Sequence, residues 1–186
     1  MVGGSIPPGV TILHVTSPQI ALLPWDENGV ALLAAMNTPE QKAHLGGPET
    51  EAKLAERQER YLTYHLPGEV EMLLVSCDGQ IVGSTGYWER EWRGRTVYEA
   101  GWEIHPGHHG RGIGRQAVTL VLDRLRRAAR HDAVHAFPAP ANLASNAICR
   151  SLGFELMGPC EFEYPKGHQM LCNDWRLPLC RAAPLP

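Results

Sequence analysis

A glycine-rich turn at residues 106–114 is the part of this chain whose residue types best suit chemistry. It contains Pro-Gly-His-His-Gly-Arg-Gly-Ile-Gly, between a β-prone run and a run with helical periodicity. Glycines let backbone N–H groups approach an anion, and a helix N-terminus carries roughly half a positive charge. The turn therefore predicts a cradle for a diphosphate group.

Two better-known glycine-rich phosphate sites have different patterns. The chain lacks G-x-x-x-x-G-K followed by Ser or Thr, which argues against a P-loop nucleotidase. The dinucleotide motif G-x-G-x-x-G belongs to an early βαβ unit and needs an acidic residue about 20 positions later. Here the turn follows a hairpin meander, and helix fills that interval.

A second motif, NLASNAICRSLGF at residues 142–154, follows about 30 residues later. Together the two motifs resemble the GNAT superfamily of acetyltransferases, closest in style to its ribosomal-protein N-terminal acetyltransferases. The family's acyl-CoA loop has Gln or Arg, then Gly three residues later, and then Gly or Ala two residues after that Gly. His109, Gly112 and Gly114 take these positions, with His replacing Gln or Arg. The resemblance covers roughly residues 11–179.

This resemblance implies an α/β GNAT fold. We expect a mixed, mostly antiparallel sheet of six or seven strands, flanked by helices and splayed between Tyr98–His105 and Ala133–Phe137, its fourth and fifth strands. The cosubstrate acetyl-CoA would dock in the splay, with its diphosphate on the loop amides. The cofactor-binding residues implied are Ile104, His105, His109, Gly110, Arg111, Gly112, Ile113, Gly114, Arg115, Asn142 and Ser145.

The resemblance also implies catalytic residues. Many members protonate the departing thiolate with a Tyr four residues before the Gly-Phe pair, where this chain has Cys149. Cys149 is either an acid or a small packing residue. In the ribosomal-protein branch a Ser of the same helix polarises the thioester, and Ser145 takes that place. Glu163 matches the base proposed for that branch on the sixth strand.

Three other residues compete with Glu163 for the role of base: Glu99, Glu103 and His135. Alternation along the strand puts Glu99 and Glu103 on the face opposite Trp102, so only one of these faces can meet the acceptor. No nucleophile has an activation signature, so we expect direct attack of the amine on the thioester in a ternary complex.

Hydrophobic periodicity predicts the elements that position these residues. One, Glu49–His65, is expected to be an amphipathic helix whose Glu and Arg side chains form a solvated outer face. Expected strands are Val10–Thr16, Val70–Ser76, Gln80–Trp88, Thr96–His105, Ala133–Phe137 and two runs on either side of Gly167. The other expected helices are Val30–Met36, Pro39–Leu45, Gly112–Arg130 and Asn142–Leu152.

Composition restricts the class of protein. The 186 residues, 44% apolar, predict one domain at residues 10–182 after a flexible N-terminus at residues 1–9. A net charge of −3 with both signs intermixed argues against nucleic-acid or membrane binding. Five widely spaced cysteines without a C-x-x-C pair indicate reduced thiols in the cytoplasm. We expect no signal peptide, no membrane span and no metal site.

These features predict an acetyl-CoA-dependent N-acetyltransferase, either a monomer or a homodimer. The acceptor would be a primary amine on a small molecule or a peptide N-terminus. The sequence also leaves open an antibiotic or a polyamine as the acceptor, and an acyl donor other than acetyl-CoA. The alternatives from other classes are a non-catalytic acyl-CoA-binding module and a structural domain without a ligand.

Overall fold

The computed structural model describes residues 18–164, 167 and 169–179, which contain eight strands and five α-helices. The strands are β1 (Ile20–Pro24), β2 (His65–Leu66), β3 (Val70–Cys77), β4 (Gln80–Trp92), β5 (Arg95–Ile104), β6 (Ala133–Ala136), β7 (Glu155–Glu163) and β8 (Gln169–Pro178). The helices are α1 (Asn28–Met36), α2 (Pro39–Lys42), α3 (Glu51–Leu62), α4 (Ile113–Ala128) and α5 (Leu143–Ser151), with a 3-10 turn, η1 (Pro106–His108).

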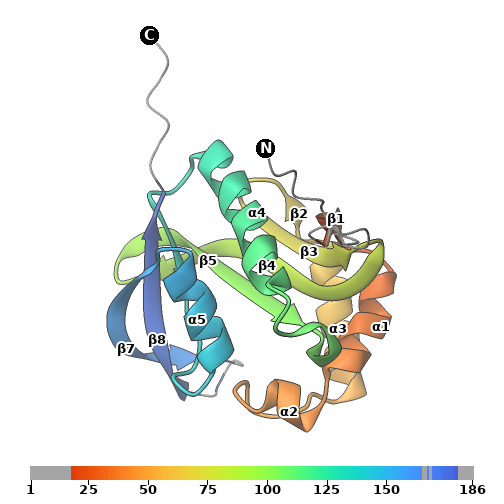
Figure 1. Ribbon diagram of the computed structural model, residues 1–186. Helices are drawn as coiled ribbons and strands as arrows, with labels where there is room; N and C mark the ends of the chain where they lie inside the picture. Colours follow the sequence, from red (N-terminus) through yellow and green to blue (C-terminus); the bar gives the residue numbers. More distant parts are fainter. Residues whose placement is uncertain (1–17, 165–166, 168, 180–186) are drawn as a thin grey trace, which may run out of the picture.

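All eight strands belong to one sheet, in the order β1-β3-β4-β5-β6-β8-β7, with β2 paired to β3 (Figure 1). Neighbouring strands are antiparallel except for β5 and β6, which are parallel. This confirms the mixed, mostly antiparallel sheet flanked by helices. The expected number of six or seven strands is too low, because β2 has only two residues and gives no periodicity.

The N-terminal part of the sheet differs from expectation. The expected strand Val10–Thr16 lies outside the described residues, and the first described strand is β1. β1 is a five-residue strand at the edge of the sheet and ends in Pro24, which cannot donate a hydrogen bond to a ladder. Its short run and flanking prolines explain why periodicity did not reveal it.

β5 pairs very differently with its two neighbours. It pairs with β4 along the whole length from Arg95 to Ile104, but with β6 only at Tyr98↔Val134 and Glu99↔His135. Beyond Glu99 the two parallel strands diverge, which confirms the expected splay. Within the described residues, the stretch from Ala100 to Ile104 therefore has a strand partner on one side only.

Helices cover both faces of the sheet. α4 and α5 lie on one face and α1 and α3 on the other (Figure 1). In α4, Ile113, Ala117, Val121 and Leu125 repeat every four residues and are at most 1% exposed, so the helix buries a continuous apolar stripe against the sheet. Within the described residues, no helix has the length and apolar composition that crossing a bilayer requires.

The α4 stripe predicts a difference in stability between two leucine substitutions. Leu125→Ala should lower the free energy of unfolding by about 2–5 kcal/mol, because it leaves a cavity in a close-packed core. Leu143→Ala, at a side chain that is 77% exposed, should change it by less than about 0.5 kcal/mol. Urea denaturation measures both values, and equal losses would contradict the assigned packing.

Candidate active site

The glycine-rich turn connects β5 to α4 through η1 and two residues with left-handed backbone. The N–H of Gly107 donates to Nδ1 of His105 at 3.3 Å, which closes the turn after β5. Gly110 and Gly112 have φ angles of 73° and 74°, a region that favours glycine. Gly112 is also the N-cap of α4. The glycines therefore allow the chain to reverse into the helix.

Backbone amides at this turn have no acceptor among the described residues. The first hydrogen bond of α4 runs from the N–H of Gln116 to the carbonyl of Gly112 at 3.1 Å. No acceptor for the amides of residues 110–115 is found within the described part of the chain. Such free donors at a helix N-terminus suit a diphosphate, which is the group that the sequence motif predicts.

Gly114 lies where α4, α5 and β5 meet. A Cβ atom added to it would be 3.0 Å from Cδ1 of Ile148 on α5 and 3.5 Å from Cγ1 of Ile104 on β5. A side chain at this position would require Ile148 to shift by a few tenths of an ångström. The packing brings the two sequence motifs together at the open end of the splay.

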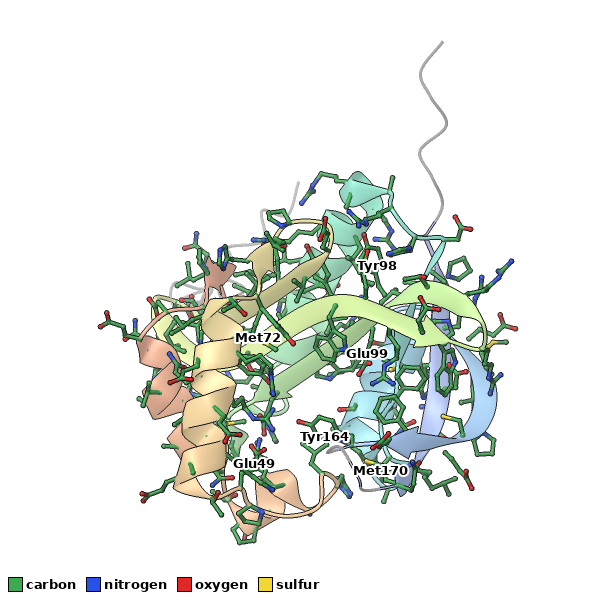
Figure 2. All side chains as sticks on the ribbon, turned by 180° about the vertical axis from the view of Figure 1, so that it is seen from behind. Glu49, Met72, Tyr98, Glu99, Tyr164 and Met170 are labelled. Carbon is green, nitrogen blue, oxygen red and sulfur yellow. The ribbon has the colours of Figure 1, made fainter. Side chains whose placement is uncertain are left out.

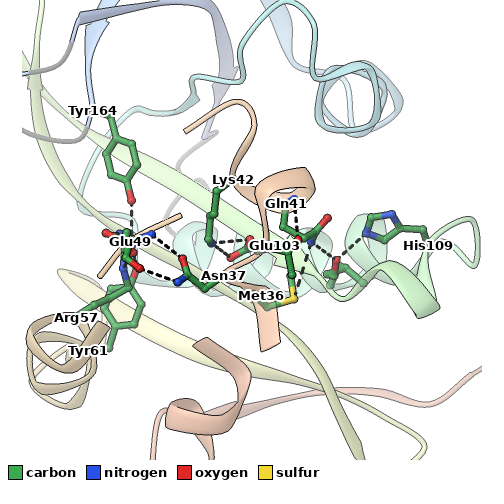
Figure 3. A network of polar contacts seen from close by, with 12 residues as sticks. Met36, Asn37, Gln41, Lys42, Glu49, Arg57, Tyr61, Glu103, His109 and Tyr164 are labelled. Atoms are coloured by element: carbon green, nitrogen blue, oxygen red, sulfur yellow. Dashed lines mark hydrogen bonds and ion pairs between the residues drawn. The ribbon is translucent and has the colours of Figure 1, made fainter. Parts of the chain in front are cut away.

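The carbonyl of Ile104 ties the turn to α2 (Figure 3). It accepts hydrogen bonds from Nε2 of His109 at 2.6 Å and from Nε2 of Gln41 at 3.2 Å. Next to it, Nζ of Lys42 contacts both carboxylate oxygens of Glu103, at 2.7 and 2.9 Å. The ring of His109 therefore braces the loop against its own strand, and Glu103 is held in an ion pair.

Glu99 and His135 lie side by side where the splay begins. Figure 2 shows Glu99 near the middle of the sheet, between α3 and the β7–β8 pair. Glu99 is 7% exposed and forms an ion pair with Arg90. Burial raises the pKa of Glu99 above its ordinary value, although Arg90 opposes the shift.

His135 forms a buried pair with Asp174 of β8. Nδ1 of His135 donates to Oδ1 of Asp174 at 2.7 Å, and Nε1 of Trp92 donates to Oδ2 at 3.0 Å. Burial alone would raise the pKa of Asp174, but these hydrogen bonds hold it below its ordinary value. Asp174 thus stays ionised and fixes the orientation of the imidazole ring.

The candidates on α5 have different environments. Asn142 caps the helix, with Oδ1 accepting the N–H of Ser145 at 3.1 Å. Ser145 lies one turn before Cys149 on the same side of α5 and is partly buried. Cys149 is fully buried in the core, and burial raises its pKa to about 12. The burial of Cys149 favours its packing interpretation.

Glu163 is not brought together with the other candidates. It lies at the end of β7, and β6 and β8 separate that strand from β5. Its side chain is exposed, and its Oε1 accepts the N–H of Gly167 at 2.6 Å within the β7–β8 connection. A carboxylate there stabilises the hairpin.

A cluster that sequence reasoning missed links α3 to the end of β7 (Figure 3). Arg57 donates to Glu49 at 2.9 and 2.5 Å and to the hydroxyls of Tyr61 and Tyr164, both at 2.9 Å. The side chain of Arg57 is only 13% exposed, so the expectation of a solvated outer face is wrong at this position. Burial raises the pKa of Tyr164, although Arg57 opposes the shift.

A pocket of about 530 Å³ lies at the far end of the β5–β6 ladder, away from the glycine-rich turn. Its lining includes Arg95, His135, Asp174 and Arg176, and no residue of the turn. Among residues 18–164, 167 and 169–179, no three His, Cys, Asp or Glu side chains are grouped as metal ligands would be.

A family model described as an acetyltransferase (GNAT) domain matches residues 19–155, which is more than half of the chain. The protein belongs to the GNAT acetyltransferase family. This is the family that the two motifs indicated.

One curated relative is L-methionine sulfoximine/L-methionine sulfone acetyltransferase from Salmonella typhimurium. It is 34% identical over 87 residues, which cover 44% of this chain and 49% of the relative. The match thus spans about half the length of that relative.

Solved structures of other GNAT proteins share the fold. The protein yncA from Salmonella typhimurium, solved with its cofactor acetyl-CoA, gives a TM-score of 0.70 at 23% identity, covering 90% of this chain and 97% of that one. An acetyltransferase from the same organism modifies the N-terminal serine of a 50S ribosomal subunit protein. Its structure gives a TM-score of 0.70 at 19% identity, covering 87% of this chain and 95% of that one. Both likenesses show the fold.

The Lys42–Glu103 pair predicts coupled effects on stability. Lys42→Met should lower the free energy of unfolding by about 1–3 kcal/mol, because it leaves a partly buried carboxylate without its partner. Adding Glu103→Gln to Lys42→Met should restore part of this loss. Urea denaturation of the two single variants and the double variant measures the coupling.

The exposed ion pair between Arg126 and Asp123 provides a control, since its side chains are 44% and 47% exposed. Arg126→Ala should cost less than about 0.5 kcal/mol. Strictly additive losses at Lys42 and Glu103 would contradict a direct interaction between them.

Proposed function

We propose that the protein transfers the acetyl group of acetyl-CoA to a primary amine by direct attack in a ternary complex. The observation that supports this best is the set of amides at residues 110–115, which have no acceptor among the described residues and lie at the N-terminus of α4. These amides would hold the diphosphate of acetyl-CoA. The bound cosubstrate would supply a thioester-activated acetyl group.

The route from the cradle to the reaction centre follows β5. The five residues from Ala100 to Ile104 have no β6 partner among the described residues, so their free edge can hydrogen-bond an extended ligand. At about 3.3 Å per residue, the strand spans about 17 Å between Ile104 and Glu99. The reactive end of the cosubstrate would therefore lie near Glu99 and His135.

Glu99 is our candidate for the general base. Cross-strand pairing and alternation place its side chain on the face that α1 and α3 cover, opposite the face of α4 and α5. A raised pKa makes a carboxylate a better proton acceptor at neutral pH. Glu103 is bound to Lys42, and two strands, β6 and β8, separate Glu163 from β5. His135 is the second candidate because it neighbours Glu99.

Ser145 is our candidate for stabilising developing negative charge at the sulfur or the thioester oxygen. It lies three residues before Ile148, whose Cδ1 is near Gly114, so it lies on the side of α5 that faces the cradle. A free strand amide at the Glu99 end of this edge of β5 would serve the tetrahedral oxyanion. Together the two donors would lower the barrier without a covalent intermediate.

The acceptor is proposed from chemistry that two similar proteins share. The curated relative is named for amino-acid acceptors, and the ribosomal-protein enzyme modifies an N-terminal serine. Both kinds of acceptor present an α-amino group. Free amino acids and short peptides are therefore the first amines to test, followed by polyamines.

The direct test measures thiol release from acetyl-CoA across this panel, with mass spectrometry of the acetylated amine. We expect release that depends on the amine. Binding of CoA without release for any amine would overturn the transferase reaction and would support a non-catalytic acyl-CoA-binding module.

Gly112→Val tests the cradle. Valine disfavours the left-handed φ of 74°, so the variant should turn the amides away and weaken CoA binding at least about tenfold. Calorimetric titration with CoA measures the affinity.

Gly79→Val is the matched control, because Gly79 has a φ of 84° with no atom near its Cβ position and lies in the β3–β4 turn. It should lose a similar amount of stability without changing CoA affinity. Equal loss of CoA affinity in the two variants would place the diphosphate elsewhere.

Glu99→Gln tests the base. It should lower kcat by about 100-fold or more, because proton removal contributes a factor of that order. The dissociation constant for CoA should stay unchanged. Steady-state kinetics of Glu99→Gln, His135→Asn and Glu163→Gln rank the three candidates, and Glu161→Gln controls for loss of an exposed carboxylate on β7. The largest loss at Glu163 or His135 would reassign the base.

The raised pKa of Glu99 also predicts the pH profile. The base must be deprotonated, so kcat should fall as pH decreases through a pKa above the ordinary value for glutamate. Arg90 opposes the upward shift, so Arg90→Gln should move this acidic limb to still higher pH. A limb unaffected by Arg90→Gln would mean that another group titrates.

A further inference from the structure

The pocket at the far end of the β5–β6 ladder is lined by four arginines and two aspartates, so its cationic side chains outnumber its anionic ones. Its volume of about 530 Å³ is within the range of sites for small molecules. Like charges repel, so four arginines around one hollow indicate a site for an anion. These arginines come from four separate segments: Arg93 from the β4–β5 turn, Arg95 from β5, Arg130 from the segment after α4, and Arg176 from β8.

Two of the four arginines are available to a ligand. Arg130 forms ion pairs with Glu69 and Glu89, and one nitrogen of Arg93 is 3.7 Å from Oδ2 of Asp174. The other two, Arg95 and Arg176, have no hydrogen bond or ion pair with any residue that the structure describes. Their guanidinium groups can therefore bind an anion without giving up an existing partner.

The two available arginines stand on either side of an apolar floor. Arg95 is on β5 and Arg176 is on β8, and β6 lies between these strands. Arg176 pairs directly with His135, and alternation puts Arg95 on the same face of the sheet. Val97 of β5 and Ala133 of β6 also line the pocket and are buried. The pocket thus offers a cation at two sides and an apolar surface beneath.

We infer that this pocket binds a small molecule with two carboxylate groups joined by a short apolar chain. A guanidinium group presents parallel N–H donors that match the two oxygens of a carboxylate. Each end of the ligand would bind one arginine, and the chain would lie over Val97 and Ala133. The site is separate from the diphosphate cradle, because no residue of the glycine-rich turn lines it. The inference does not depend on the proposed function, since this binding needs neither acetyl-CoA nor acetyl transfer.

Titration with glutarate, followed by nuclear magnetic resonance at constant ionic strength, tests the site residue by residue. The Nε–H signals of Arg95 and Arg176 and the indole N–H signal of Trp92, which also lines the pocket, should shift and saturate. Pentanoate has the same five carbons and one carboxylate, so it should bind at least about fivefold more weakly. Inorganic phosphate has the charge without the chain and should also bind more weakly. Tighter binding of phosphate than of glutarate would overturn the assignment to a dicarboxylate.

Arg95→Gln and Arg176→Gln should each raise the dissociation constant for glutarate about 5- to 10-fold, because each removes one charge-assisted contact. Arg127→Gln is the matched control. Arg127 is an exposed residue of α4 outside this pocket, and no hydrogen bond or ion pair joins it to another described residue. This control variant should bind glutarate as the wild type does. Saturating CoA should change the affinity of the wild type for glutarate by less than about twofold, because the two sites are separate.

Three results would overturn the inference. Equal weakening by Arg127→Gln would mean that glutarate responds only to net charge. Shifts confined to the amides of residues 110–115, or displacement of glutarate by CoA, would place the anion in the cradle. Shifts that do not saturate would mean that the pocket is not a site. The test is distinct from that of acetyl transfer, because a protein that releases no thiol from acetyl-CoA is still expected to bind glutarate here.

Discussion

The parallel pairing of β5 with β6 is the constraint on which the rest of the site depends. Parallel neighbours cannot be joined by a tight turn, so the chain must cross over between them, and α4 is that crossover. The N-terminus of α4 therefore has to start at the carboxyl end of β5. Because the pairing stops at Glu99 and His135, the strands separate toward that same end. One topological choice thus places free helix amides and a free strand edge together.

Packing then holds this arrangement without help from a ligand. Gly114 packs closely against Ile148 and Ile104, and a Cβ atom there would be tight against Ile148. On the other side, the carbonyl of Ile104 is fixed by His109 and Gln41. A loop braced from both sides loses little freedom when it binds an anion, so more of the contact energy contributes to affinity.

Sequence patterns predicted the parts of the molecule that are determined by residues close together in the sequence. α4 has a four-residue apolar repeat, and the β3–β4 turn has the Asp78-Gly79 pair, so both were visible along the chain. The glycine-rich turn was visible for the same reason, because positive φ angles need particular residues at particular positions. The family followed from the two motifs, and the splay from the resemblance that they carry.

The contacts that make the site polar were not predictable in this way, because their partners are far apart in the sequence. Arg57 meets Tyr164 across 107 positions, Lys42 meets Glu103 across 61, and His135 meets Asp174 across 39. Each of these residues, taken alone, is of a type that is common on protein surfaces. Only the stacking of α2 and α3 on the sheet, and the order β5-β6-β8, bring the partners together.

These buried pairs gather on the face opposite α4 and α5, and stability alone does not explain them. Removing charges from water costs about as much as their attraction returns, so apolar residues would serve the fold equally well. A face with fixed charges is instead suited to a polar acceptor whose amine must lose a proton. Glu99, the proposed base, is subject to two opposed effects: burial raises the pKa of its carboxylate, and Arg90 opposes that rise.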